Sequence, residues 1–315
     1  MYGSRMLKKD WVTWHRVLIG IVSLFGGLSV GLVTSSAASS AALPSATSSH
    51  LVPATSGGTS LPSDIVGVTP GAGSTSSWLV GSDGGVFAYG GAPFEGSLPA
   101  LGVQTSDIVG IASDSDGGGY WLAGADGGVF SFGTAPFDGS LPQLGLHVSD
   151  IVGIAASSSP SGKGYLLVGA DGGVFSFGGA SYEGSLPGQD VHVSNIVGIA
   201  ATPDGRGYWL VGADGGVFAF GSAQFKGSIP GLGDHSSRIV DMASAPDEGG
   251  YWLVGADGGV FAFGDAPFDG SIPGTVETGA GSTVSNIVGM AVNPNGQGYL
   301  LVGADDHVTA FCGAC

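Results

Sequence analysis

Short apolar runs alternate with turns rich in Gly, Asp, Ser and Pro along the chain from residue 64 onward. The clearest stretch has an apolar run from Ile108, a Gly-rich turn, two alternating runs from Tyr120 and Val129, and an ending around Phe137. Brief alternation of apolar and polar residues, bounded by turn residues, is typical of β-strands. The pattern therefore predicts four short strands per unit, which we name a to d.

This unit recurs six times, at intervals of 43 to 48 residues. The units begin at Asp64, Asp107, Asp150, Asn195, Arg238 and Asn286. Coils of a β-helix are shorter and a trefoil has fewer units, whereas units of this length and strand number are typical of propellers. We therefore expect an all-β fold, a six-bladed β-propeller, over residues 57–315.

The junction between strands b and c carries an Asp-Gly pair in five units, which predicts a type I′ hairpin turn with both central residues at positive φ. These aspartates are Asp83, Asp126, Asp171, Asp214 and Asp257. The sixth unit has Asp305-Asp306-His307 instead, so its hairpin is expected to be the most degenerate. One carboxylate per turn is too few for a calcium loop, and we assign the aspartates a structural role in the turns.

The sixth unit stops at Cys315 without a strand d. Residues Gly58–Pro62, before the first unit, resemble the strand-d ending Gly96–Pro99. An N-terminal strand is therefore expected to complete the last blade and close the ring, which leaves few free sheet edges.

One repeat reads Gly-Tyr-Trp-Leu-Val-Gly-Ala-Asp-Gly-Gly-Val-Phe-Ala-Phe-Gly from Gly207 to Gly221. It resembles the repeats of exported actinobacterial proteins, and the resemblance covers residues 64–311. Such repeats stand alone or beside cell-wall or hydrolytic domains, and the resemblance brings no catalytic residues with it. It implies an exported propeller-like module. The Trp ending of quinoprotein-type repeats and the WD-repeat pattern are both missing.

Residues 1–42 differ in kind from the rest: basic residues precede an uncharged run from Val17 to Val33 and then small residues. This layout predicts a secretory signal, cut after Ala38 or Ala42, or an uncleaved membrane anchor. Residues 43–56, rich in Ser, Ala, Thr and Pro, are expected to be a lead-in. The predicted location is secreted or cell surface, with membrane contact only through an uncleaved N-terminal segment.

Residues 43–315 hold four basic residues against 24 acidic ones. Binding to a phosphate backbone requires Lys and Arg, so nucleic acid is excluded as a partner. Cations or neutral glycans fit this charge better, and the expected partner is a cell-wall glycan or an extracellular protein.

Three histidines, each three residues before a strand a in consecutive units, form the sharpest candidate for a ligand or divalent-metal site: His147, His192 and His235. If the loops before strand a lie on the same face as the b–c turns, these histidines share a face with the turn aspartates. The alternative is a surface His copied with the repeat. Cys312 and Cys315 form a lone pair near the end, where a disulfide or free thiols are expected rather than redox or zinc chemistry.

Strand b carries Trp or Leu at one position and a neighbouring Tyr that should point the opposite way. Exchange of Trp with Leu indicates packing between blades, with an aromatic sugar-binding platform as the alternative. A second acidic set on strand d is expected to be solvated or to protect a sheet edge. Its members are Glu95, Asp138, Glu183 and Asp269, and the fourth unit has Lys226 instead.

Together these features predict an exported, non-catalytic binding or scaffolding module. The main alternative is a hydrolase or lyase with its site at the mouth of the propeller channel. That alternative requires departures from the repeat to converge at one place, and in the sequence they are scattered: Lys226, Arg238, Asp241 and the longer fifth-unit loop from Thr275 to Val284. A third alternative is a spacer whose recognition site lies in the fifth unit.

Overall fold

A computed structural model describes residues 46–49, 64–73, 76–232, 238–275, 286–294 and 296–311 of the chain. By its internal contacts the chain divides into two units, Met1–Ala42 and Leu43–Cys315. Every described residue belongs to the second unit, and the fold is that of Leu43–Cys315 alone. Among the described residues, no helix is long and apolar enough to cross a membrane.

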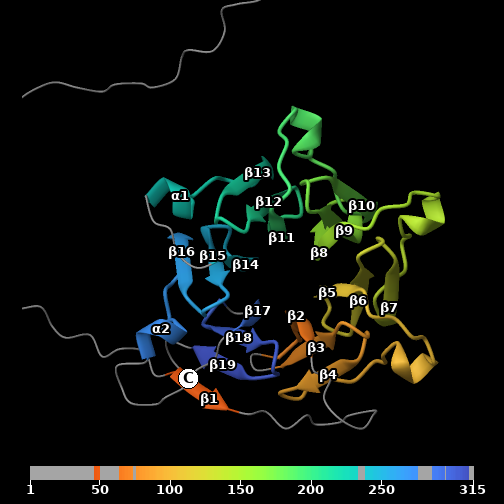
Figure 1. Ribbon diagram of the computed structural model, residues 1–315, viewed down its shortest axis with the longest axis horizontal. Coiled ribbons are helices and arrows are strands. Elements are labelled where there is room, and N and C mark those ends of the chain that lie inside the picture. Colours follow the sequence, from red (N-terminus) through yellow and green to blue (C-terminus); the bar gives the residue numbers. More distant parts are fainter. Residues whose placement is uncertain are drawn as a thin grey trace, which may run out of the picture. The chain divides into compact units, whose positions relative to one another are not determined.

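The fold is all-β, with six antiparallel sheets that follow one another along the chain (Figure 1). From the innermost strand outward they are β2 (Ile65–Pro70), β3 (Ser77–Gly81) and β4 (Val86–Tyr89); β5 (Ile108–Ser113), β6 (Gly119–Gly124) and β7 (Val129–Gly133); β8 (Ile151–Ser159), β9 (Gly162–Gly169) and β10 (Val174–Gly178); β11 (Ile196–Ala201), β12 (Gly207–Gly212) and β13 (Val217–Gly221); β14 (Ile239–Ser244), β15 (Gly250–Gly255) and β16 (Val260–Gly264); and β17 (Ile287–Val292), β18 (Tyr299–Gly303) and β19 (Val308–Phe311). These are strands a, b and c of the six units. The prediction of a propeller-like all-β fold is confirmed at this level.

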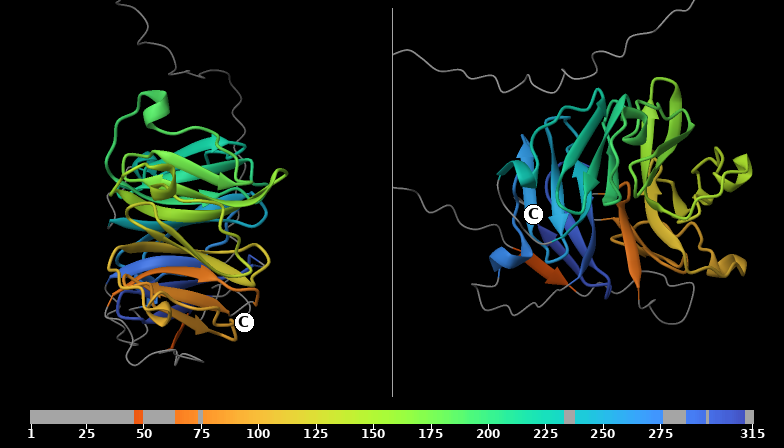
Figure 2. Two further views of the ribbon diagram at one scale, coloured as in Figure 1. Left: turned by 90° about the vertical axis from the view of Figure 1, so that its right-hand side faces the viewer. Right: turned by 45° about the horizontal axis from the view of Figure 1, so that its top comes forward.

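Strand d, predicted around Phe137 and its equivalents, does not form in any of the first five units. In its place an irregular segment leads to a single helical turn at the outer edge (Figure 1, Figure 2). These turns are η1 (Pro99–Leu101), η2 (Pro142–Leu144), η3 (Pro187–Gln189), α1 (Ile229–Leu232) and α2 (Ile272–Thr275). The prediction of four strands per unit is therefore wrong.

The hydrogen bonds of the irregular segment explain why it is not a strand. In the second unit the Trp121 Nε1 donates to the carbonyl of Pro136 at 2.6 Å. The Tyr165 hydroxyl, from the next sheet, donates to the carbonyl of Gly139 at 2.5 Å. Proline also removes one backbone donor from the segment. Because side chains of two successive sheets bind these carbonyls, the segment ties neighbouring sheets together.

The b–c hairpins form where the Asp-Gly pairs predict them, but their turn type differs from the prediction. In the β6–β7 hairpin the Gly127 amide donates to the carbonyl of Gly124 at 2.9 Å, and Gly127 has φ +76°. Asp126 is not among the described residues with positive φ. A turn followed by one left-handed residue matches the three-residue loop with a bulge, not the type I′ turn. In the sixth unit Asp306 takes the left-handed position at φ +65°.

The core lies between successive sheets. Trp121 and Tyr165 come from adjacent middle strands, with ring centroids 5.3 Å apart, and Tyr165 stacks on Phe177 at 5.4 Å. Similar aromatic contacts recur around the fold. The Trp and Tyr side chains of strand b are at most 1% exposed. Packing of Trp between sheets is therefore confirmed, and the alternative of an exposed platform on these residues is wrong.

The sixth sheet packs against the first through Tyr89 on β4 and Val302 on β18, in one buried cluster. The inner strands β17 and β2 are also in contact. A further strand, β1 (Ala46–Ser49), pairs antiparallel with β19 at the outer edge of the sixth sheet. β1 lies within the segment expected to be an exposed lead-in, while Gly58–Pro62 lies outside the described residues.

Candidate binding site

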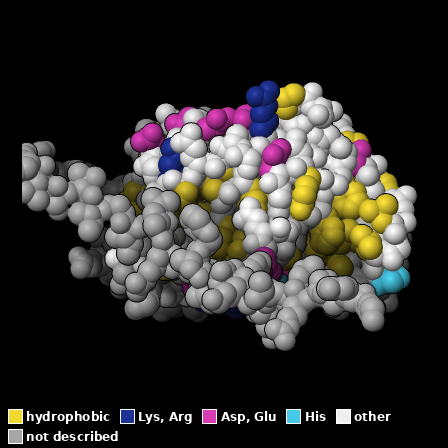
Figure 3. Space-filling view, turned by 90° about the horizontal axis from the view of Figure 1, so that it is seen from above, with side chains coloured by type: hydrophobic (Ala, Val, Ile, Leu, Met, Phe, Trp, Pro, Cys, Tyr) yellow, Lys and Arg dark blue, Asp and Glu magenta, His cyan; other side chains and the backbone are white. Residues whose placement is uncertain are grey.

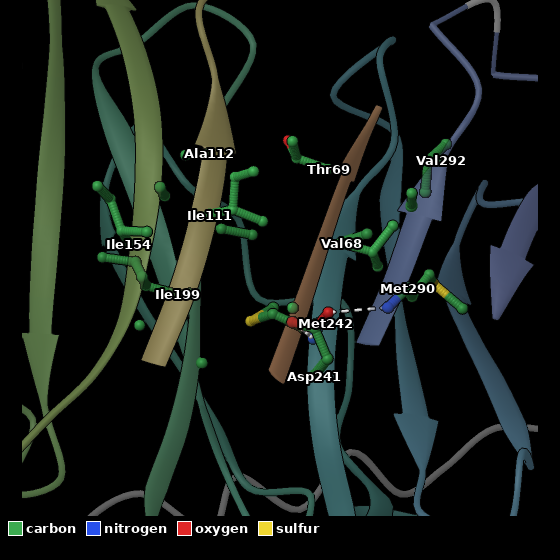
Figure 4. A pocket seen from close by; sticks show the side chains of 18 of the residues that line it. Val68, Thr69, Ile111, Ala112, Ile154, Ile199, Asp241, Met242, Met290 and Val292 are labelled. Carbon is green, nitrogen blue, oxygen red and sulfur yellow. Dashed lines mark hydrogen bonds between the residues drawn. The ribbon is translucent and has the colours of Figure 1, made fainter. Parts of the chain in front are cut away.

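A cavity of about 380 Å³ lies between the inner strands, and its lining comes from all six sheets. Most of the lining side chains are aliphatic, such as Ile111, Ile154 and Val68 in Figure 4, and backbone groups of the strands add polar surface. Hydroxyl groups stand further along the same strands, where Thr69 Oγ1 donates to Ser113 Oγ at 3.1 Å. Volumes of this size accommodate small molecules.

Glycine brings the inner strands close together around this cavity. The third residue of strand a is Gly67, Gly110, Gly153, Gly198 and Gly289 in five of the six units. A Cβ on Gly289 would lie 3.1 Å from Val68 Cγ1 on the neighbouring strand, closer than an ordinary contact. All six inner strands also change register next to this position. Glycine at this position therefore allows the inner strands to approach one another closely.

Asp241 on β14 takes this glycine position in the fifth unit, so a single carboxylate enters the cavity (Figure 4). Its Oδ1 accepts the Met242 amide at 2.8 Å, and its Oδ2 accepts the Met290 amide of the next sheet at 3.0 Å. Among the described residues that line the cavity, Asp241 is the one titratable side chain. The carboxylate therefore has two backbone donors, and the described lining of the cavity holds no basic side chain beside it.

Burial raises the pKa of the Asp241 carboxyl to about 6, because the charged form loses solvent around it. The two amide hydrogen bonds act in the opposite direction, since they favour the charged form, but burial is the larger effect. Side chains with perturbed pKa values in cavities are frequent at functional sites. The sequence showed Asp241 as one departure from the repeat, but its place in the cavity follows only from the fold.

Of the three histidines predicted as a site, His147 and His192 are exposed and do not line the cavity. The His192 Nε2 lies 3.2 Å from the Asp190 Oδ1, an acidic neighbour that the sequence reading did not assign to it. His235 lies outside the described residues, as do Cys312 and Cys315. In the described part of the chain no group of three His, Cys, Asp or Glu side chains is arranged to hold a metal ion.

The loops before strand a do share a face with the b–c turns. In the β6–β7 turn the Ala125 amide donates to the carbonyl of Asp107, and its carbonyl accepts the Ile151 amide. The turn aspartates have the local role expected from the sequence: each Oδ1 accepts the amide two residues further on, at 2.7 to 3.0 Å. Their carboxylates are thus used within the turns.

The outer segments present aromatic side chains to solvent. Phe137, Tyr182, Phe225 and Phe268 are 51 to 59% exposed, and Phe94 is half-buried. The sequence reading placed them on strand d, and their exposure was missed. One signal was available, because this position is aromatic in all five units, whereas the buried Trp position also accepts Leu.

Acidic groups accompany these aromatics. Asp138 and Glu183, each next to an aromatic residue, are exposed, while Glu95 and Asp269 are half-buried. On the side of the molecule seen in Figure 3, separate hydrophobic patches lie among uncharged groups, with acidic side chains along one edge. The expectation of a solvated acidic set is confirmed for the two exposed members.

No protein-family model matches the chain, and no curated protein in the comparison is significantly similar to it.

Proposed function

We propose that this protein is an exported, non-catalytic binding or scaffolding module that holds a neutral cell-wall glycan outside the cell or at its surface. The observation that supports it best is the exposed aromatic side chain on four of the five outer segments, in Phe137, Tyr182, Phe225 and Phe268. Exposed aromatic rings offer large apolar faces to a ligand at little conformational cost.

Repetition is the second argument for this function. Equivalent aromatics in successive units present a series of similar contacts, which suits a ligand that is itself a repeating polymer. Several weak contacts to one chain add up by avidity, because each further contact forms at a high effective concentration. A glycan offers such a periodic partner, and an extracellular protein is the competing partner.

The charge of the surface narrows the ligand class. With four basic residues against 24 acidic ones beyond residue 42, the chain repels anionic polymers. Asp138 and Glu183 stand directly beside aromatic residues and add to this repulsion. A neutral polysaccharide fits these features better than a phosphorylated polymer does.

The proposal includes how the chain reaches its place and how the ring closes. We assign residues 1–42 to a signal peptide or membrane anchor, on the basic and uncharged pattern of the sequence alone. We also propose a six-bladed propeller closed by an N-terminal strand. The pairing of β1 with β19 and the contact of β17 with β2 support this closure.

The alternative of a hydrolase or lyase at the channel has one group in its favour, Asp241. Acid–base hydrolysis commonly uses a pair of titratable groups, one as general acid and the other as general base or nucleophile. The described lining of the cavity supplies one. A binding role therefore fits the described residues better than catalysis.

The test is a sedimentation assay with insoluble cell-wall polysaccharide and the chain from Leu43 onward. We expect the combined variant Phe137→Ala, Tyr182→Ala, Phe225→Ala, Phe268→Ala to lose at least about tenfold in affinity, while single variants lose much less. The matched comparator is His147→Ala with His192→Ala, which changes exposed groups on another loop. If the histidine variant loses affinity for the polysaccharide and the aromatic variant does not, the binding site lies on the loops that carry His147 and His192. Equal retention of all three proteins would refute the proposed surface.

A further inference from the structure

The cavity between the six inner strands contains a carboxylate with no structural counterpart in the other five units. Asp241 stands where those units have glycine, and its side chain reaches the neighbouring strand at Met290 (Figure 4). Glycine alone satisfies the packing of the inner strands at this position in five sheets. The other five sheets therefore form without a carboxylate at this position.

The carboxylate retains accepting capacity toward the cavity. A carboxylate offers about four acceptor positions, two on each oxygen. Each oxygen of Asp241 uses one of them for a backbone amide, Oδ1 for Met242 and Oδ2 for Met290. The remaining positions can accept hydrogen bonds from a guest in the cavity.

The surroundings determine which guest this would be. Ile111, Ile154, Ile199 and Val68 line the cavity together with the methionines beside Asp241. A half-buried carboxylate among aliphatic groups gains most from a cation that replaces the lost water. A hard divalent ion needs several oxygen ligands, and Asp241 is the one carboxylate of the described lining. An organic cation needs one carboxylate and apolar contacts.

We propose that the cavity around Asp241 is a binding site for a small organic monocation, an ammonium group on an apolar body. The ammonium hydrogen-bonds to the Asp241 carboxylate, and the apolar body lies against the isoleucine and valine side chains of the inner strands. This site is separate from the exposed aromatics of the outer segments and does not depend on the glycan proposal.

Three probes of similar shape test the charge requirement: cyclohexylammonium, cyclohexanol and cyclohexanecarboxylate. Calorimetry or ligand-observed NMR at pH 7.5 on the chain from Leu43 onward should give at least about tenfold tighter binding of the ammonium than of the alcohol, because hydrogen bonds to charged groups are the strong ones. The carboxylate probe should not bind. Saturable binding of the alcohol and the ammonium with equal affinity would overturn the proposal, as would no binding of any probe.

The repeat supplies the matched variants. Asp241→Gly restores the residue of the other five units, so the fold is expected to persist, and it should remove the preference for the ammonium. The second variant adds Gly110→Asp to Asp241→Gly; a Cβ at Gly110 would lie 3.4 Å from Ile154 Cγ2, an ordinary contact. Return of ammonium binding in this double variant would show that a carboxylate at this level of the cavity is sufficient. Unchanged binding in Asp241→Gly would overturn the assignment.

A pH series adds an independent readout. The groups that face Asp241 from β11, β14 and β17 are backbone and apolar, including Gly198, Met242 and Gly289, and none of them titrates. Ammonium affinity should therefore fall as the pH decreases from 7.5 to 5 and the one carboxylate becomes protonated. An affinity that does not change over this range would contradict the site.

Discussion

Replacement of Asp241 by glycine should change how the stability of this protein depends on pH. Burial raises the pKa of the Asp241 carboxyl from 3.8 to about 6, so the folded state holds this proton more tightly than the unfolded state does. The resulting stabilisation is complete below pH 3.8 and is lost as the pH rises through 6. This direction is the opposite of that for a salt-bridged carboxylate.

The magnitude follows from the shift. A pKa difference of about two units corresponds to about 3 kcal/mol between the two protonation states. Part of this loss occurs below pH 4.5, so about 2 kcal/mol should be lost between pH 4.5 and 7.5. Asp241→Gly removes the titrating group, so the free energy of unfolding of the variant should not show this decrease with pH. Loss of the hydrogen bonds from the Met242 and Met290 amides changes the stability of the variant by the same amount at every pH and does not affect this comparison.

Urea unfolding of the wild-type protein and the variant at several pH values measures the effect. The other carboxylates titrate in both proteins, so the difference between their free energies of unfolding isolates Asp241. Asp265→Asn, which removes an exposed carboxylate, controls for the loss of one negative charge. If the curves of wild type and Asp241→Gly run parallel within about 0.5 kcal/mol from pH 4.5 to 7.5, the fold does not raise the pKa of this carboxyl.

Three further predictions concern the turns and the aromatic contacts. Glu248 has φ +62° at a turn position where Gly205 of the preceding unit has φ +64°. Because glycine adopts this left-handed conformation without strain, Glu248→Gly should raise the free energy of unfolding by about 1 kcal/mol. An unchanged or lower Tm would refute this prediction. A Cβ on Gly127, at φ +76°, would lie 2.5 Å from Leu141 Cδ1. Gly127→Ala should therefore lower the free energy of unfolding, measured in urea, by more than about 2 kcal/mol. A smaller decrease would show that the turn adapts to the extra methyl group. The buried Tyr89 hydroxyl has no hydrogen-bond partner within the described structure, whereas the Tyr165 hydroxyl has two. Tyr89→Phe should therefore leave the free energy of unfolding unchanged or raise it, and Tyr165→Phe should lower it by about 1 to 2 kcal/mol. Equal effects of the two substitutions in thermal unfolding would contradict this prediction.

The sequence predicted the parts of the fold that rest on local chemistry and periodicity. Alternating runs around Tyr120 and Val129 predicted two strands, and both form as β6 and β7. The Asp-Gly pair predicted a hairpin at the right place because glycine is needed at one left-handed position. It did not predict the turn type, since a type I′ turn and a bulged three-residue loop both favour glycine after Asp.

The prediction of strand d failed because strand patterns do not reveal which hydrogen-bond partners a segment finds. The run around Phe137 has the apolar content of a strand, but its carbonyls bind Trp121 of its own sheet and Tyr165 of the next. Such side-chain contacts between units form only after the sheets are in place. For the same reason the exposure of Phe137 was not predictable from its hydrophobicity.

The candidate sites depend on how the repeat is kept and where it is broken. The outer position is aromatic in five units, and in four of them the ring is exposed rather than packed in the core, a pattern that fits the proposed repeated contact with an extended ligand. The carboxylate of Asp241 occurs once, at the level where all six inner strands meet, and breaks the symmetry of the cavity. The two proposals therefore rest on different features of the repeat: the glycan proposal on an outer position that is repeated, and the cation proposal on an inner position that differs in one unit.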